Sequence, residues 1–387
     1  MRIIQISDVH LDERRQLAGA LRLTADGESE ALVRTTQCVD HVISAALSLG
    51  PVDLWAITGD LFDAPTPTQH EVRAAVRLVY CMADQAPVVV LAGNHDAPMA
   101  GAGATALEGL KLRKRVHVVE QPEVLRIAGA SVVCLPYPRR AELVALAPEG
   151  SREERNAAAS QALQSMLTVL RDSDYGAPKV CLYHGTITGS VVGAQPRTLS
   201  GDVELHAGAF AGFDVSLAGH IHKRQQFTSR VHYAGSIDRV DFDEEHDTKC
   251  ALDVRLYANG DVTVTEIPTP ARRYVTLPAA PDADWQWEPS VVYRVKARVS
   301  AAEAVAVRGR VSELSGAGCW ITAALDVADE ARVRDEAARP DESPAAMLAR
   351  WVASNPQHTA EVAAAHNAEL AAVNNDVERL HAALAGA

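Results

Sequence analysis

The chain has 387 residues, of which 48% are hydrophobic, and a formal net charge of −13. This length accommodates one large domain and one or two small ones with a proper apolar core. The negative balance argues against a protein that coats nucleic acid. The segment from Asp326 to the end contains 11 acidic and 5 basic residues, so it carries −6 and the first 325 residues carry −7. No apolar run approaches the roughly 20 residues that span a membrane, and no signal-peptide pattern precedes the first apolar run, so no membrane association is expected.

Short apolar runs alternate with amphipathic stretches in the first part of the chain. We expect strands over residues 2–6, 52–57 and 88–92, and helices over 30–49 and 69–83. This β-α-β-α-β order is typical of a mostly parallel sheet with helices on both faces. In such sheets, ligands and catalytic groups lie at the carboxyl ends of the strands.

The same alternation continues through the middle of the chain. We expect strands over 132–135, 179–183 and 214–218, and a helix over 151–170. Two further strands, 252–257 and 261–267, flank Asn259-Gly260, which is a strong hairpin signal.

A boundary is expected at Pro268-Thr269-Pro270. Beyond it, a strand over 293–299, a helix over 301–314 and a strand over 319–324 predict a small α+β module. We therefore divide the chain into a large domain, a small α+β domain and a C-terminal helical segment, with the bounds 1–270, 271–338 and 339–387.

The C-terminal segment has the pattern of a helix that binds another helix. Ser343-Pro344 is a typical helix start. In the last expected helix, residues 359–384, five apolar residues follow the three-four spacing of a coiled coil. We predict docking onto a partner helix, with packing against its own domain as the alternative. The candidate partner-binding residues are Trp351, Leu370, Val373, Val377, Leu380 and Leu384.

Ligand-type side chains follow five of the expected strands. Each residue alone is more often structural, but five such segments in a fixed order favour a metal site. Asp8 and His10 are two apart, so in an extended segment both would point to the same side and suit one ion. The candidate ligands are Asp8, His10, Asp60, Asn94, His184, His220 and His222.

These residue types predict a two-metal centre. Carboxylate, imidazole and amide groups without thiolate suit Mn, Fe or Zn better than a structural zinc site. Two ions about 3.5–4 Å apart clamp the attacking and leaving oxygens of a phosphoryl displacement and lower the pKa of a water between them. We expect one ion to bind Asp8, His10 and His222, and the other to bind Asn94, His184 and His220, with Asp60 touching both.

Two residues beside Asn94 are the candidate catalytic residues. His95 is expected to contact the phosphate or to protonate the leaving oxygen. Asp96 is expected to orient His95 or to form a turn with its own backbone.

Taken in order, Asp-x-His, Gly-Asp, Gly-Asn-His-Asp, an isolated His and Gly-His-x-His resemble the motifs of the calcineurin-type metallophosphoesterases, over roughly residues 1–270. The resemblance implies an α/β fold, a four-layer sandwich of mixed β-sheets flanked by helices. Four longer stretches are similar to SbcD-type nuclease subunits of double-strand-break repair. They are GDLFD at 59–63, LAGNHD at 91–96, LAGHIH at 217–222 and AGSIDRVDF at 234–242.

The closer resemblance implies a Mn²⁺-dependent exonuclease and endonuclease acting on DNA ends and single strands. It also implies a capping domain, C-terminal helices that bind an SMC-like ATPase (SbcC-like), a homodimer through the phosphoesterase domain, and a cytoplasmic, nucleoid-associated location. Two residues depart from the pattern. Asp12 stands where many members have Gly, and Asp63 stands where archaeal and eukaryotic members often have a His associated with exonuclease action. The balance between the two activities is left open.

Several basic residues follow the site motifs directly and are candidates for contact with a phosphate backbone, although a surface role is equally expected for each. They are Arg14, Arg15, Arg139, Arg140, Lys223 and Arg224. Two other hypotheses remain. A phosphodiesterase or phosphatase for nucleotides or other small phosphoesters fits the acidic charge slightly better, whereas the intact ligand set speaks against a docking module without activity.

Overall fold

The computed structural model describes residues 1–97, 105–138, 150–173, 176–192 and 203–328, together with the single positions 143, 195, 196, 343 and 346. Two compact units are distinguished. The first comprises Met1–Arg298 with Ala304–Asp326, and the second comprises Val299–Glu303 with Val327–Ala387. The predicted domain boundaries after residues 270 and 338 stay predictions. The candidate partner-binding residues from Trp351 to Leu384 lie outside the described residues.

One mixed six-stranded sheet has the order β16-β15-β1-β2-β3-β4. Its four strands β1 to β4 are parallel, and the hairpin of β15 and β16 adds antiparallel to β1, as the Asn259-Gly260 signal predicts. The strands β1, β2 and β3 are buried at every position, which explains their continuous apolar sequences. The bounds are β1 Arg2–Ile6, β2 Leu54–Ile57, β3 Val88–Leu91, β4 Val116–Val119, β15 Cys250–Leu256 and β16 Val262–Pro268.

A second mixed six-stranded sheet has the order β13-β14-β12-β7-β6-β5. The four strands from β14 to β6 are parallel, and β13 and β5 pair antiparallel at the two edges. The bounds are β5 Glu123–Ile127, β6 Ala130–Leu135, β7 Lys179–His184, β12 Val215–Gly219, β13 Gln225–Thr228 and β14 Val231–Tyr233.

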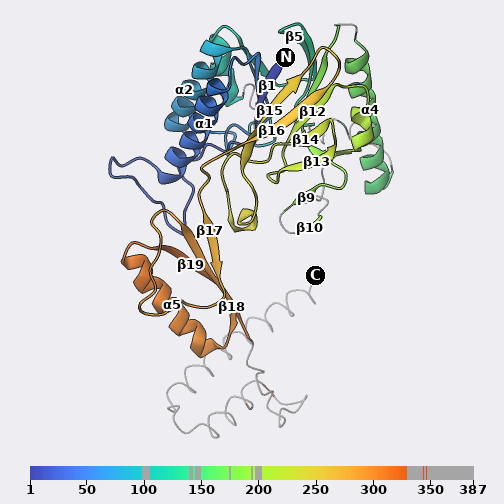
Figure 1. The fold of residues 1–387 in the computed structure, drawn as a ribbon. Coiled ribbons are helices and arrows are strands. Elements are labelled where there is room, and N and C mark those ends of the chain that lie inside the picture. Colours follow the sequence, from blue (N-terminus) through green and yellow to red (C-terminus); the bar gives the residue numbers. More distant parts are fainter. Residues whose placement is uncertain are drawn as a thin grey trace, which may run out of the picture. The chain divides into compact units, whose positions relative to one another are not determined.

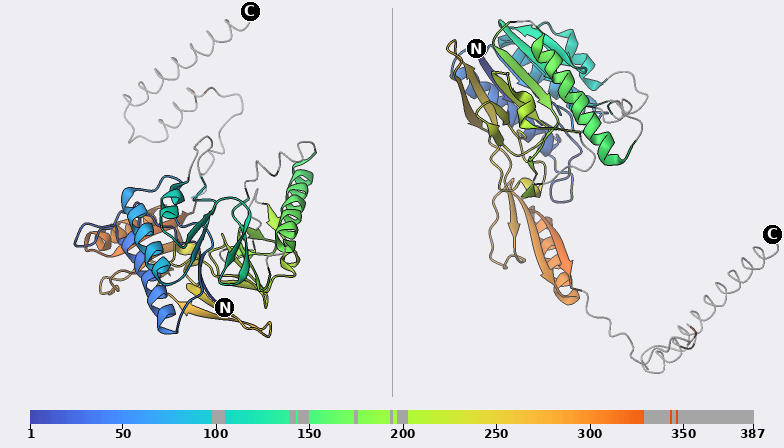
Figure 2. Two further views of the ribbon diagram at one scale, coloured as in Figure 1. Left: turned by 90° about the horizontal axis from the view of Figure 1, so that it is seen from above. Right: turned by 90° about the vertical axis from the view of Figure 1, so that its right-hand side faces the viewer.

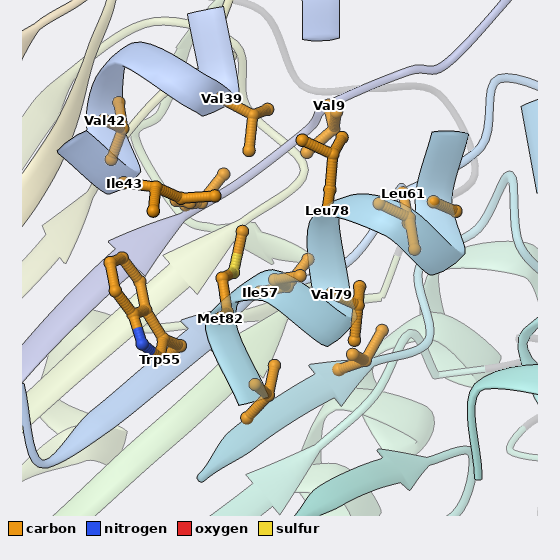
Figure 3. Close-up of a cluster of buried hydrophobic side chains, with 14 of the residues drawn as sticks. Val9, Val39, Val42, Ile43, Trp55, Ile57, Leu61, Leu78, Val79 and Met82 are labelled. Carbon is orange, nitrogen blue, oxygen red and sulfur yellow. The ribbon is translucent and has the colours of Figure 1, made fainter. Parts of the chain in front are cut away.

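The helices and the two sheets lie in layers (Figures 1 and 2). Three apolar cores hold these layers together. The first core joins one face of the first sheet to α1 (Glu30–Ser48) and α2 (Gln69–Gln85), and Figure 3 shows Trp55 and Ile57 of β2 within it. The second core consists of residues from both sheets and therefore lies between them. The third joins the outer face of the second sheet to α4 (Arg152–Asp172). The predicted α/β fold of mixed sheets and helices is confirmed.

The described helices begin close to where the sequence predicts, because their first residues are capped. The Ser29 side chain accepts a hydrogen bond from Leu32 N, and Thr68 and Glu71 form a capping box at the start of α2. Glu71 also accepts the backbone N–H of Glu13 at 2.8 Å, which fixes the loop that follows His10.

Shorter elements connect the layers, and the sequence patterns did not predict them. They are η1 Ala106–Leu112, β8 Thr186–Ile187, β9 Val191–Val192, β10 Gln195–Pro196, β11 Glu204–Leu205, η2 Ala207–Phe210 and η3 Phe242–Glu244.

A three-stranded sheet in the order β17-β18-β19 follows the large sandwich in the chain. It consists of β17 (Tyr274–Leu277), β18 (Val292–Val299) and β19 (Trp320–Val327), and α5 (Ala301–Gly316) connects the last two strands. These elements have a small apolar core of their own, as expected for an α+β module. Among the described helices, none is both long enough and apolar enough to cross a bilayer.

Candidate metal centre

The seven candidate ligands lie at the carboxyl ends of strands in both sheets. The first sheet supplies four of them, after β1, β2 and β3, and the second sheet supplies three, at the ends of β7 and β12. The first four are Asp8, His10, Asp60 and Asn94, and the last three are His184, His220 and His222. Segments that are far apart in the sequence therefore meet at one edge of the sandwich.

The ligand atoms form two groups. In the first, atoms of Asp8, His10 and His222 all lie within 4.8 Å of one another. In the second, atoms of Asp60, His184 and His220 do the same. Asn94 belongs to the second group, since its Oδ1 lies 3.0 Å from His184 Nε2 and 2.8 Å from His220 Nδ1.

Asp60 lies between the two groups. Its Oδ2 atom is 3.8 Å from His10 Nε2 and 3.4 Å from His184 Nε2. A carboxylate in this place is able to touch ions in both positions. The structure brings all seven residues together in the expected division, and their individual roles as ligands stay a prediction.

The backbone at these residues is unusual. Asp8, His10, Asp60 and His220 have positive φ angles of 49°, 50°, 51° and 101°. The expectation of an extended segment at Asp8 and His10 is therefore wrong. The chain turns here while Asp8 N and His10 N donate to Gly59 O and Asp60 O, at 3.2 and 3.0 Å. Left-handed non-glycine residues cost about 1–3 kcal/mol each and gather at functional sites, where the surrounding structure fixes them.

Two glycines allow the strands to approach the ligands closely. A Cβ atom on Gly59, which has a φ of 101°, would overlap the His184 ring. A Cβ atom on Gly93 would overlap the Asp60 carboxylate. The glycine in each of the Gly-Asp and Gly-Asn-His-Asp motifs is therefore required by packing against a ligand side chain.

Hydrogen bonds on the far side of two imidazoles orient them towards the centre. His184 Nδ1 donates to Thr58 O at 2.7 Å, and His222 Nδ1 donates to Glu244 Oε1 at 2.7 Å. His10 Nδ1 lies 3.0 Å from Asp63 Oδ1, although it is not aligned for a good hydrogen bond. Donation from Nδ1 leaves the lone pair of Nε2 for a metal ion.

The donor set fits a pair of divalent ions. His10 Nε2 and His222 Nε2 lie 3.0 Å apart, so the two nitrogens can share a proton, and a bound cation would take the place of that proton. The set combines carboxylate, imidazole and amide oxygen and contains no thiolate, which suits Mn, Fe or Zn.

Burial and charge act in opposite directions on the histidines of the centre. Burial lowers the pKa of His184, but attraction to Asp60 and the bond to Thr58 raise it, to about 9. Burial also lowers the pKa of His10, and there it prevails over the opposing effect of Asp63. Burial raises the pKa of Asp60, but attraction to His184 and His10 lowers it by a larger amount. The net pKa is lowered, so the carboxylate is ionised.

His95 is placed beside the centre and is not held by Asp96. Its backbone N–H donates to Asp60 Oδ1 at 2.9 Å, its Nδ1 lies 2.6 Å from Asp63 O, and its ring packs edge-on against His10. The ring is therefore oriented by the Asp63 carbonyl, next to both groups of ligands.

Asp96 is buried and accepts three backbone N–H groups, from Leu61, Phe62 and Gly93, at 3.0–3.2 Å. Burial, with the nearby Asp60 charge, raises its pKa to about 6. These contacts hold together the turns after β2 and β3. The bond to Gly93 N closes the turn with its own backbone that was one of the expected roles of Asp96, and Asp96 thus positions these turns. The structure gives Asp96 no hydrogen bond to the His95 ring, and its catalytic role stays a prediction.

Three residues close to the ligands were missed by the sequence patterns as part of the centre. In the sequence, Asp63 stands out only as a departure from a family pattern, and Glu244 and Lys249 belong to none of the motifs. Glu244 comes two residues after the AGSIDRVDF stretch, which is the one signal that pointed to this region.

The basic residues that are candidates for DNA contact differ in whether their side chains already bind other groups of the protein. The Arg15 side chain donates to His10 O at 2.8 Å, and Arg224 pairs with Glu266 at 2.8 Å, so both have structural partners. Arg14 is largely exposed, and Lys223 lies 3.8 Å from Asp247. Arg139 and Arg140 lie outside the described residues.

Comparison with known protein families agrees with this geometry. The model of the calcineurin-like phosphoesterases matches residues 1–224, a segment that contains every one of the seven candidate ligands and His95. The match covers more than half of the chain. The sandwich of two mixed sheets, with clusters of His and Asp side chains at one edge, is consistent with this match. The chain is a member of the calcineurin-like phosphoesterase family, and it is a metal-dependent phosphoesterase.

Proposed function

We propose that this phosphoesterase is a DNA nuclease that cleaves phosphodiesters during the processing of DNA ends in repair. It is proposed to use two Mn²⁺ ions and to work as the SbcD-like subunit of a complex with an SMC-like ATPase. The C-terminal helices would bind that partner, and the phosphoesterase domain would form a homodimer. A cytoplasmic, nucleoid-associated location follows from this role.

The residues at the centre have distinct tasks in this reaction. Asp8, His10 and His222 would hold one ion, and Asn94, His184 and His220 the other, with Asp60 between them. When bound, such a pair supplies positive charge to the phosphoryl oxygens and makes a water nucleophile available near neutral pH. His95 donates its Nδ1–H to Asp63 O, so in the doubly protonated ring the Nε2–H would be the proton given to the leaving oxygen.

One observation carries the choice of DNA as substrate. The AGSIDRVDF stretch, one of the four that resemble repair nucleases, lies directly behind His222, because Ser236 N donates to His222 O at 3.0 Å. Arg239 of the same stretch donates to Glu244 O, Asp247 O and Arg272 O, at 2.8–3.1 Å. A stretch that resembles a nuclease family thus contacts a candidate ligand of the metal centre, and this supports the proposal.

The alternative is a phosphodiesterase or phosphatase for nucleotides or other small phosphoesters. The net charge of −13 favours it, as does the engagement of Arg15 and Arg224 by groups of the protein itself. Arg15 and Arg224 are therefore less available to a DNA backbone than exposed basic residues would be.

The two functions are separated by offering substrates of both kinds to the full chain loaded with Mn²⁺. We expect cleavage of end-labelled duplex and single-stranded DNA, and none by the Asp60→Ala variant. The protein is assayed both alone and with a purified SMC-like ATPase. If it hydrolyses bis(p-nitrophenyl) phosphate but cleaves no DNA in either case, the nuclease proposal is wrong and the small-phosphoester function is supported. Co-purification with that ATPase, weakened by Val377→Glu or Leu380→Glu, tests the proposed partner.

A further inference from the structure

A buried pair of opposite charges lies behind one of the candidate ligands. Lys249 Nζ is 2.6 Å from Glu244 Oε2, and the exposed fractions of the two side chains are 0% and 8%. Charged groups are almost never buried without a structural or functional reason, because desolvation costs several kcal/mol per ion. The groups that the pair contacts indicate its function.

The contacts of the pair are directed at His222. Glu244 Oε1 accepts the Nδ1–H of the His222 ring at 2.7 Å, while Lys249 Nζ donates to the His222 carbonyl at 2.9 Å. Lys249 also donates to Ser236 Oγ at 2.8 Å, and Ser236 Oγ lies 3.1 Å from Glu244 Oε2. Both the ring and the backbone of His222 are therefore fixed by one small network.

The buried histidine of the other group, His184, has a different kind of acceptor behind it. There the Nδ1–H of His184 is accepted by the Thr58 carbonyl, which carries no formal charge. A carboxylate behind an imidazole makes its Nε2 a stronger donor and adds negative charge close to the ion. The first group also contains the Asp8 carboxylate, where the second has the neutral amide of Asn94.

We propose that Glu244, held in place by Lys249, is a positioning residue that strengthens binding of the ion held by Asp8, His10 and His222. The two ion positions are then unequal, and this one is filled first. The proposal concerns the metal centre and does not depend on DNA as the substrate.

The test measures Mn²⁺ binding to the full chain by calorimetry, without any substrate. Glu244→Gln keeps the shape of the side chain and removes its charge. We expect it to weaken the tighter of the two binding steps about 10- to 100-fold, as loss of a partner behind a metal-binding histidine does elsewhere. The weaker step should be unchanged.

Asp247→Asn provides a matched control. Asp247 lies 3.7 Å from the same Lys249 but makes no contact with the His222 ring, so this variant removes a neighbouring charge without touching the hydrogen bond. We expect Mn²⁺ affinity to stay close to that of the wild type. An equal loss of affinity in Asp247→Asn and Glu244→Gln would overturn the proposal in favour of a general effect of charge.

A double-variant comparison assigns the effect to one position. In the His222→Ala background the imidazole that Glu244 contacts is absent, so adding Glu244→Gln should change Mn²⁺ binding no further. In the Asn94→Ala background, which weakens the other position, the full loss should remain. A loss of the same size in both backgrounds would also overturn the proposal.

Folding is controlled separately, because Glu244→Gln leaves the Lys249 charge buried without its partner. Circular dichroism of the metal-free variant reports whether the fold persists. If it does not, Glu244→Gln combined with Lys249→Met removes the pair as a whole and should show the same weakening of the tighter step. Wild-type affinity in that double variant would refute the role of Glu244.

Discussion

Substitution of Gly59 by alanine tests how closely the sandwich is built around its ligands. Gly59 has a φ of 101°, and an added Cβ would overlap the ring of His184, which is fully buried and hydrogen-bonded to Thr58 O. The left-handed backbone alone costs an alanine about 1–2 kcal/mol. Displacing a fixed, buried ring adds about 1–3 kcal/mol, as other overpacked cores show. The total expected loss of unfolding free energy is thus about 2–5 kcal/mol.

Gly27→Ala is the matched control for this prediction. Gly27 has a φ of 81° with no atom within 4 Å of its added Cβ, so its substitution incurs the backbone cost without the overlap. Urea denaturation of the metal-free proteins measures both losses, and calorimetry with Mn²⁺ measures the effect on the centre. Of the two variants, we expect only Gly59→Ala to weaken Mn²⁺ binding, because the added methyl group displaces the His184 ring. Equal losses of stability and unchanged Mn²⁺ affinity in both variants would refute the packing argument.

Three further predictions concern individual residues of the centre. His95→Gln should lower kcat about 10²- to 10⁴-fold with Mn²⁺ binding unchanged; a lower metal stoichiometry would instead make His95 a ligand. Asp96→Asn should lower the free energy of unfolding by about 1–3 kcal/mol, measured in urea, because an amide N–H group would face a backbone N–H; wild-type stability would contradict its positioning role. The pKa of His184 is raised to about 9, so this residue keeps its proton below that pH. Metal binding to His184 at about pH 8 should therefore release about one proton, and this proton release should decline above pH 9. Calorimetry in buffers of different ionisation enthalpy measures this release, and its absence at pH 8 would contradict the pKa.

The sequence predicts that the candidate ligands lie close together because two independent signals coincide there. Apolar runs such as 88–92 predict buried strands, and the polar residues directly after them, such as Asn94, lie where parallel sheets place their sites. The observed strands end within a residue or two of the expected ones, so the ligands arrive at the same edge of the sandwich. Neither signal requires knowledge of the turns themselves.

The turns and the supporting residues were harder to predict for a physical reason. The left-handed backbone at Asp8 and His10 results from hydrogen bonds to residues about 50 positions later, at Gly59 and Asp60, which no local pattern reveals. Glu244 likewise matters only because the chain returns behind His222. In the sequence, nothing distinguishes Glu244 from its acidic neighbours Asp243 and Glu245, and only the three-dimensional structure shows which of them contacts His222.

Each sheet contributes part of the candidate ligand set, and this division affects how the two sheets separate when the protein unfolds locally. The residues from the first sheet and those from the second are joined by the packed core between the layers and by hydrogen bonds at the centre, such as His184 Nδ1 to Thr58 O and His220 N to Asp8 Oδ1. Bound ions would fasten the layers at one edge, so removing them with a chelator would let that edge separate first. Amide hydrogen exchange should then quicken at the carboxyl ends of β7 and β12, and remain slow where α4 covers the opposite face.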